Sequence, residues 1–230
     1  VCGFNVAGTQ SRTHLQRHSN ISNETKDFKF MASREVELAG VKTLALRVSF
    51  TGDLGWELHC QDKDQAQLYK TLVDEGAALG IKPVGSRALM SLRCEKGYGS
   101  WGREYSPEYH AHEVGLERLV KTEKDFLNKS AYLETQKSAA RERLVVLEVH
   151  PSFDADATGG EPIFSRQGAP LGRVTSGSMG YTVGKSLALG FVKPEIAAGT
   201  EIHVMILGQP TPATVLAEPP FDPKGERLRA

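Results

Sequence analysis

The chain has 230 residues, of which 40% are hydrophobic and 24% are charged, and that length supports one large domain or two smaller ones with cores of their own. Its 28 basic and 28 acidic residues cancel, so no basic surplus indicates a nucleic-acid partner. No uninterrupted apolar run approaches the ~20 residues of a membrane span, so we expect no membrane partner.

The first part of the chain alternates helix and strand patterns. A possible helix runs through Leu15, and residues 64–79 place their apolar residues on one helical stripe. Another helix is expected to begin at Ser86 and to end at Gly97. The aromatic stretch after it is interrupted by Gly and Pro, which predicts a long ordered loop. A last helix is expected within residues 131–143.

Residues 34–50 indicate two strands that are joined at Ala39-Gly40. Apolar residues alternate along the second strand, and we expect them to form its buried face: Leu44, Leu46, Val48 and Phe50. Arg47 and Ser49 would then point to the other side.

The residue pattern changes after Arg143, where short β-rich runs are separated by Gly and Pro turns. One of these turns is a hairpin centred on Gln167-Gly168. Regularly spaced short strands are typical of an antiparallel barrel or sandwich. We therefore predict an α+β fold, with an antiparallel sheet and packed helices in residues 1–140 and a small antiparallel β-barrel in residues 141–230.

Few patterns in the sequence point to chemistry. The three cysteines have no metal-ligand spacing, and a sparse odd set fits buried thiols in a reducing compartment. His110 and His112 fall short of the three or four ligands that a metal site requires, so we predict no metal. The glycine-rich turns lack the spacing of a phosphate-binding loop, and no nucleophile elbow is present.

Glu57 comes after a glycine-punctuated turn, inside a strand that also carries Trp56 and Leu58. Trp56 and Leu58 share one face of that strand and Glu57 takes the other. The carboxylate is then either a solvated strand residue or a group facing a cleft, where it can accept two parallel N–H bonds from a planar heterocycle. The residues alone leave both interpretations open.

Three separated stretches, taken in order, resemble the aminomethyltransferase superfamily, whose founding member is the glycine-cleavage T-protein. They are "ALRVSFTGDLGWELH", "SRALMSLRCEKGYGSWGREYSPE" and "GRVTSGSMGYTVGKSLALGFV". The branch most similar is formed by the C-terminal folate domains of sarcosine and dimethylglycine dehydrogenases, to which "EKGYGSWGRE" and the ending "PPFDPKGERLRA" point.

The resemblance implies tetrahydrofolate as the cofactor, bound in a cleft where it takes up a one-carbon unit. In the dehydrogenase branch a flavin domain oxidises an N-methyl group to an iminium, so FAD is expected only in a flavin domain outside this chain. The implied partners are a small N-methyl amine or its iminium, an N-terminal portion or flavin domain outside the chain, and a possible oligomer. The implied compartment is the cytoplasm, or the mitochondrial matrix in a eukaryote.

The resemblance also implies cofactor-binding residues. Glu57 matches the family glutamate that holds the pterin ring. Phe50 stands where the T-protein pattern has a tyrosine, so ring packing is kept and the phenolic hydrogen bond is lost. The arginine with which the T-protein pattern would meet the carboxylates of the folate tail is missing here. Arg87, two positions away from it, either takes its place or is a surface cation. Tyr98 and Trp101 wall the ligand or pack the two parts of the chain together.

No catalytic residue is assigned, because the catalytic Asp of the family belongs to an N-terminal portion and this chain resembles the region after that portion. We expect a tetrahydrofolate-binding segment for one-carbon transfer, an incomplete part of a flavin-linked dehydrogenase that demethylates N-methylglycines. Three alternatives stay open: a T-protein-like aminomethyltransferase, a folate-dependent O- or S-demethylase, and a non-catalytic folate-binding module.

Overall fold

The computed structural model describes residues 1–230, and the chain divides into two compact units. The first unit consists of Val1–Leu89 together with Asp222–Ala230, and the second consists of Met90–Phe221. The dividing point thus lies inside a helix, because the irregular segment after that helix packs with the barrel. The division into domains at residues 140 and 141 stays a prediction about domain organisation.

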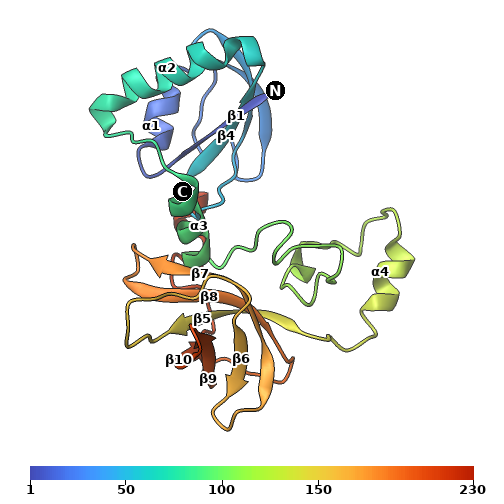
Figure 1. The fold of residues 1–230 in the computed structure, drawn as a ribbon. Coiled ribbons are helices and arrows are strands. Elements are labelled where there is room, and N and C mark those ends of the chain that lie inside the picture. Colours follow the sequence, from blue (N-terminus) through green and yellow to red (C-terminus); the bar gives the residue numbers. More distant parts are fainter. The chain divides into compact units, whose positions relative to one another are not determined.

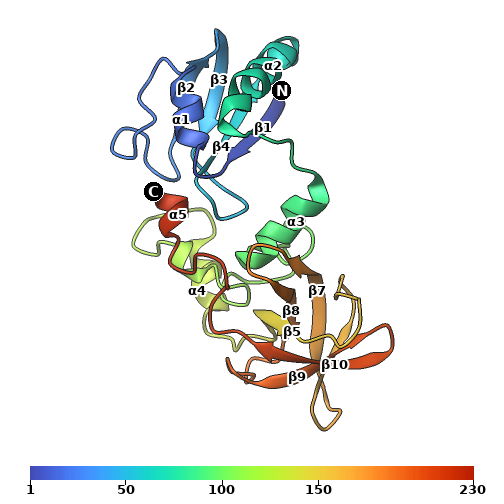
Figure 2. The same ribbon diagram turned by 90° about the vertical axis from the view of Figure 1, so that its left-hand side faces the viewer.

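The first unit is an antiparallel sheet with helices on one face (Figures 1 and 2). Its strands, in the spatial order β1-β4-β3-β2, are β1 (Cys2–Ala7), β4 (Gly55–Cys60), β3 (Val41–Leu46) and β2 (Ser33–Leu38). The α-helices that lie wholly within it are α1 (Ser11–Gln16), α2 (Gln65–Gly76) and α5 (Glu226–Arg229). Leu15 of α1 and Leu68 of α2 pack with Trp56 of β4 in one hydrophobic core. The predicted arrangement, with helices on one side of an antiparallel sheet, is confirmed.

The predicted ends of α2 are only partly confirmed. The helix is preceded by a 3₁₀ turn at Asp62–Asp64 and followed by another at Ala77–Leu79. Gly80 then ends the helical segment in the left-handed conformation at φ 74°, as expected for a glycine stop. Neither the first 3₁₀ turn nor the helix has a side-chain cap hydrogen bond at its start.

The predicted buried face of β3 is wrong. Leu44 is 44% exposed, whereas Val41, Thr43, Ala45 and Arg47 are buried. Each face of this strand carries apolar residues, so the sequence pattern alone does not show which face is buried. The pairing with β4 does choose, because Ala45 stands opposite the fully buried Leu58, and opposite residues share one face of a sheet.

The second unit contains the later part of α3 (Ser86–Glu95), an irregular segment, and a closed antiparallel barrel. The irregular segment carries a 3₁₀ turn at Glu117–Leu119 and the short helix α4 (Lys129–Thr135). The barrel strands, in the order β10-β5-β8-β7-β6-β9, are β10 (Gln209–Val215), β5 (Arg143–Val149), β8 (Lys185–Val192), β7 (Pro170–Gly180), β6 (Pro162–Ser165) and β9 (Glu201–Ile206). The predicted small barrel is confirmed.

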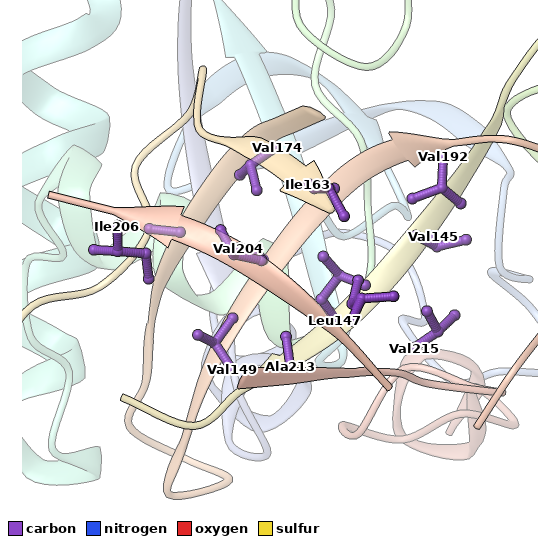
Figure 3. Packing of buried hydrophobic residues seen from close by; sticks show 13 residues of the cluster. Val145, Leu147, Val149, Ile163, Val174, Val192, Val204, Ile206, Ala213 and Val215 are labelled. Atoms are coloured by element: carbon purple, nitrogen blue, oxygen red, sulfur yellow. The ribbon is translucent and has the colours of Figure 1, made fainter. Parts of the chain in front are cut away.

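The barrel interior is aliphatic (Figure 3). Leu147, Ile163 and Val204 are fully buried and come from three different strands. The hairpin between β6 and β7 turns where the sequence predicts it, with Gly168 at φ 86°. None of the helices in either unit combines the length and the apolar character needed to cross a bilayer.

Strand β10 contains two prolines, Pro210 and Pro212. It pairs with β9 along Gln209–Thr214, but with β5 only along Ala213–Val215. The two prolines therefore lie in the half of the strand that has no ladder to β5. Proline has no N–H for a ladder, which confines it to such edge positions.

Candidate functional site

Glu57 lies near the middle of β4, between strands β1 and β3 (Figure 2). Its neighbours Trp56 and Leu58 are 1% and 0% exposed and belong to the core under the helices. Glu57 therefore takes the opposite face of the sheet, as the alternation predicts. Across the sheet it stands opposite Asn5 of β1 and Leu46 of β3.

The carboxylate of Glu57 is free to accept hydrogen bonds. Its side chain is 38% exposed, and Oε2 lies 3.6 Å from Nε2 of His59, which is 35% exposed. That separation is longer than a hydrogen bond, and no protein group donates to either oxygen. Glu57 lines neither the cavity beside His14 in the first unit nor the cavity at the barrel. It stands instead on an open strand face.

The turn before β4 explains the glycines beside Glu57. The backbone N–H of Gly52, at φ 88°, donates to the Ser49 hydroxyl at 3.1 Å. A side chain at Gly55 would stand 3.2 Å from the Val6 carbonyl oxygen of β1. Gly52 thus permits a left-handed turn and Gly55 permits close strand approach. Phe50 lies half-buried in the bend that opens this turn.

Arg47 precedes the same turn and lies inside the first unit. The side chain is fully buried, and its guanidinium donates to the carbonyl oxygens of Phe28, at 2.7 Å, and of Ala230. It also lies over the Trp56 ring, 5.7 Å from the ring centroid. Burial lowers the pKa of Arg47, and the nearby Arg12 lowers it further. The predicted outward position of Arg47 is therefore wrong, because two backbone carbonyls and one aromatic face hold its charge in the core.

The other predicted site residues are spread over both units. Arg87 is exposed and lies on the part of α3 that belongs to the first unit. Glu57 and Phe50 belong to the same unit. Tyr98 is half-buried in the second unit, with the Lys96 ammonium 5.8 Å from its ring centroid. Trp101 is 78% exposed in the same loop. Their roles in binding stay predictions.

A buried ion pair in the second unit was not predicted from the sequence. Nη1 of Arg93 lies 3.1 Å from Oε2 of Glu104, and the two side chains are 1% and 0% exposed. The same guanidinium donates to the Tyr98 carbonyl oxygen at 2.9 Å and to the Ser176 hydroxyl at 2.7 Å. One signal was available, because Arg93 lies four residues after Leu89 and so shares its helix face.

Glu104 joins the aromatic loop to strand β7. Oε2 accepts the backbone N–H of Ser100 at 2.8 Å, and Oε1 accepts the hydroxyls of Thr175 at 2.7 Å and Ser176 at 2.6 Å. Burial raises the pKa of Glu104, but these donors and the Arg93 charge outweigh it and hold that pKa below its usual value. The carboxylate is therefore ionised and clamps residues 98–104 to the barrel.

A second buried carboxylate, Glu113, holds the segment that leads into β5. It is 1% exposed and accepts from the side chain of Arg141, at 2.9 and 3.0 Å, and from the backbone N–H groups of His110 and Arg141. The Arg141 side chain is the main cause that lowers the pKa of Glu113, to about 2. Glu113 is thus a structural acceptor rather than a metal ligand beside His110 and His112, whose rings stack 5.6 Å apart.

The sheet with its one-sided helices, the closed barrel and the glycine-bounded strand of Glu57 define a two-unit α+β protein of a known kind. The family model described as the GCVT N-terminal domain matches residues 1–124. The model of the glycine cleavage T-protein C-terminal barrel domain matches residues 142–222. The chain belongs to the glycine cleavage T-protein family.

The relatives include dehydrogenases and aminomethyltransferases. The chain is 36% identical to mouse dimethylglycine dehydrogenase over 93% of its own length and 25% of that protein, and 31% identical to mouse sarcosine dehydrogenase over 98% and 25%. It is 33% identical to an aminomethyltransferase of Natranaerobius thermophilus, covering 93% of this chain and 58% of the other. The chain therefore spans about a quarter of these dehydrogenases.

A solved structure has the same fold. The crystal structure of the glycine cleavage system aminomethyltransferase T from Bartonella henselae aligns with a TM-score of 0.81 and 22% identity. The alignment covers 96% of this chain and 60% of the other. At that identity the likeness concerns the fold alone.

Proposed function

We propose that this chain is a tetrahydrofolate-binding segment for one-carbon transfer, of the kind that serves flavin-linked demethylation of N-methylglycines. The observation that carries the proposal is the carboxylate of Glu57, fixed between two buried neighbours and left without a hydrogen-bond donor of its own. Such a group suits the adjacent N–H donors of a pterin ring, because a charge-assisted bidentate pair is the strong form of that contact.

Tetrahydrofolate would supply the amine that takes up the one-carbon unit. The contribution of this chain is to hold the pterin, with Glu57 as acceptor and Phe50 as a packing ring beside the turn. Arg87, Tyr98 and Trp101 are further candidates, for the folate tail and the ring walls. Because Glu57 stands on an open strand face, we propose that the rest of the pocket, and any flavin, come from a segment or domain outside these 230 residues.

Folate binding tests the role of Glu57 directly. Titration calorimetry with 5-formyltetrahydrofolate should show that Glu57→Gln weakens binding about 10- to 100-fold, because the isosteric amide removes the charge and turns a donor toward the donors of the pterin. Glu37→Gln is the matched control, since Glu37 is an exposed glutamate on β2 of the same sheet. Equal affinities of the Glu57→Gln variant and the unmodified chain would contradict the proposal.

A turnover assay separates transfer from binding alone. The chain, joined to the flavin domain of a dimethylglycine dehydrogenase, is given an N-methyl amine and tetrahydrofolate, and release of free formaldehyde is measured. Reduced release in the presence of tetrahydrofolate supports a one-carbon transfer segment. Folate binding with unchanged release supports the non-catalytic folate-binding module instead.

A further inference from the structure

The open face of the first sheet carries a polar row and an aliphatic row side by side. Along β4, Glu57 and His59 point the same way, because residues two apart in a strand share a face. Along β3, Leu46 stands opposite Glu57, and Leu44, which is 44% exposed, stands opposite His59. Neighbouring strands lie about 4.8 Å apart. This surface therefore suits a flat ring that rests its face on the leucines and turns a polar edge toward β4.

Gly3 of β1 leaves room for the ring of His59. The two residues stand opposite each other, and a β-carbon at Gly3 would lie 3.3 Å from Nδ1 and 3.5 Å from Cε1 of His59. The ring thus lies beside this glycine with Nδ1 toward it. The other nitrogen, Nε2, lies 3.6 Å from Oε2 of Glu57. Because the side chains of His59 and Glu57 are 35% and 38% exposed, a ligand can reach both.

Nε2 of His59 and Oε2 of Glu57 form a donor and an acceptor side by side. They lie too far apart for a hydrogen bond with each other, and an imidazole with its proton on Nε2 donates from that atom. Each hydrogen bond to a ligand would span about 2.9 Å, so the two groups can reach adjacent atoms of one ring edge. The matching edge has a carbonyl oxygen next to an N–H.

A 2-amino-4-oxo pteridine has this edge. Its 2-amino group and its N3–H are neighbouring donors, which a carboxylate accepts as a bidentate pair, and the C4 carbonyl beside N3 is an acceptor. A 2,4-diaminopteridine has an amino group at C4 and no hydrogen on N3. Its edge therefore offers no oxygen to His59, and it turns a ring lone pair toward Glu57 in the same orientation.

We propose that His59 is a specificity-determining residue of the pterin site. Its Nε2–H donates to the C4 carbonyl while Glu57 accepts the 2-amino and N3 hydrogens, and Leu44 and Leu46 support the face of the ring. The site then favours 2-amino-4-oxo pteridines over 2,4-diaminopteridines. This inference rests on the folate-binding function proposed above, and it adds the ring chemistry that the site selects.

Calorimetric titration of the 230-residue chain with two ligands tests the role of His59. Folic acid carries the 4-oxo group, and aminopterin is the same molecule with a 4-amino group in its place. His59→Phe keeps a flat ring but removes the donor, so the affinity for folic acid should fall roughly 3- to 10-fold. The affinity for aminopterin should change less than about twofold, because it has no bond to His59 to lose.

Three further variants complete the test. His59→Leu also removes the donor and should behave as His59→Phe does, which decides the matter if one of them does not fold. His59→Gln keeps an N–H and should recover most of the affinity for folic acid. His110→Phe is the control, since His110 is an exposed histidine of the second unit, and it should change the affinity for neither ligand.

Glu57→Gln distinguishes failure of this inference from failure of the proposed function. If that variant weakens folic acid binding but the His59 variants leave the ratio of the two affinities unchanged, the role of His59 is refuted and the folate site stands. If folic acid does not bind, or binds Glu57→Gln as tightly as the unmodified chain, the folate site is refuted and the role of His59 is refuted with it.

Discussion

Removing the charge of Glu104 tests the buried ion pair of the second unit. In Glu104→Gln the amide oxygen can still accept from Arg93 and from the Ser100 N–H, and the hydroxyls of Thr175 and Ser176 can rotate to accept from the amide group. The negative charge is lost, however, and the guanidinium of Arg93 stays 1% exposed. Breaking a buried pair by removing one partner costs about 3–5 kcal/mol.

Two substitutions should therefore bracket that range. Glu104→Gln should lower the free energy of unfolding by about 3 kcal/mol, since its acceptor survives, and Glu104→Leu by about 5 kcal/mol, since no acceptor remains. The double variant Arg93→Met/Glu104→Leu should be more stable than Glu104→Leu alone, because it leaves no unpaired buried charge. Glu142→Gln is the matched control, since Glu142 pairs with Arg173 at 2.8 Å but both are partly exposed, at 31% and 45%.

Urea unfolding followed by far-UV circular dichroism measures these differences, with the slope checked for each variant. The control should change the free energy of unfolding by less than about 1 kcal/mol. The reasoning is refuted if Glu104→Leu costs no more than the control, or if the double variant loses the sum of its two single losses. Either result would mean that Arg93 does not depend on Glu104 for its burial.

Two further predictions concern acid stability and barrel packing. The pKa of Glu113 in the folded protein is about 2, below its ordinary 4.5, so the stabilisation from its ionised form is fully present above pH 4.5 and is lost as pH falls toward 2. Because the partner Arg141 is 62% exposed, we expect about 2 kcal/mol, and thermal melts between those two pH values should show a shallower decline in Glu113→Gln. A methyl group at Gly172 would stand 1.9 Å from the Phe191 carbonyl oxygen, whereas one at Gly85 would meet nothing within 4 Å. Gly172→Ala should therefore cost about 3 kcal/mol or more in urea unfolding and Gly85→Ala almost nothing; equal stabilities of the two variants would contradict the close approach of β7 and β8.

The sequence predicted those elements whose signals are local. The barrel strands and the β6–β7 turn follow from short apolar runs separated by residues such as Gly168, which alone suits φ 86° at little cost. The outward position of Glu57 follows in the same way, because the alternation around Trp56 and Leu58 has one hydrophobic side. The predicted fold class is confirmed for these reasons.

Tertiary pairing decided the features that the sequence did not predict. Strand β3 offers apolar residues on both faces, and its register against β4 buries the face of Ala45, to which Arg47 belongs just after the strand. The sequence did not single out Arg93 and Glu104, because nothing local shows that Ser176, more than seventy residues later, completes their network. The cavity beside His14 likewise needs the turn after α2, which is distant in sequence from α1.

The two prolines of β10 have a consequence for crowded solutions. A strand whose outer side is bare can recruit the backbone of another molecule, and such recruitment begins many protein aggregates. Beside β5 the Pro212 carbonyl oxygen accepts the backbone N–H of His150, and beyond that point neither Pro210 nor Pro212 offers the amide hydrogen that an incoming chain would need. The exposed edge of β10 is therefore protected against intermolecular strand addition by its prolines, although the strand carries no charged residue.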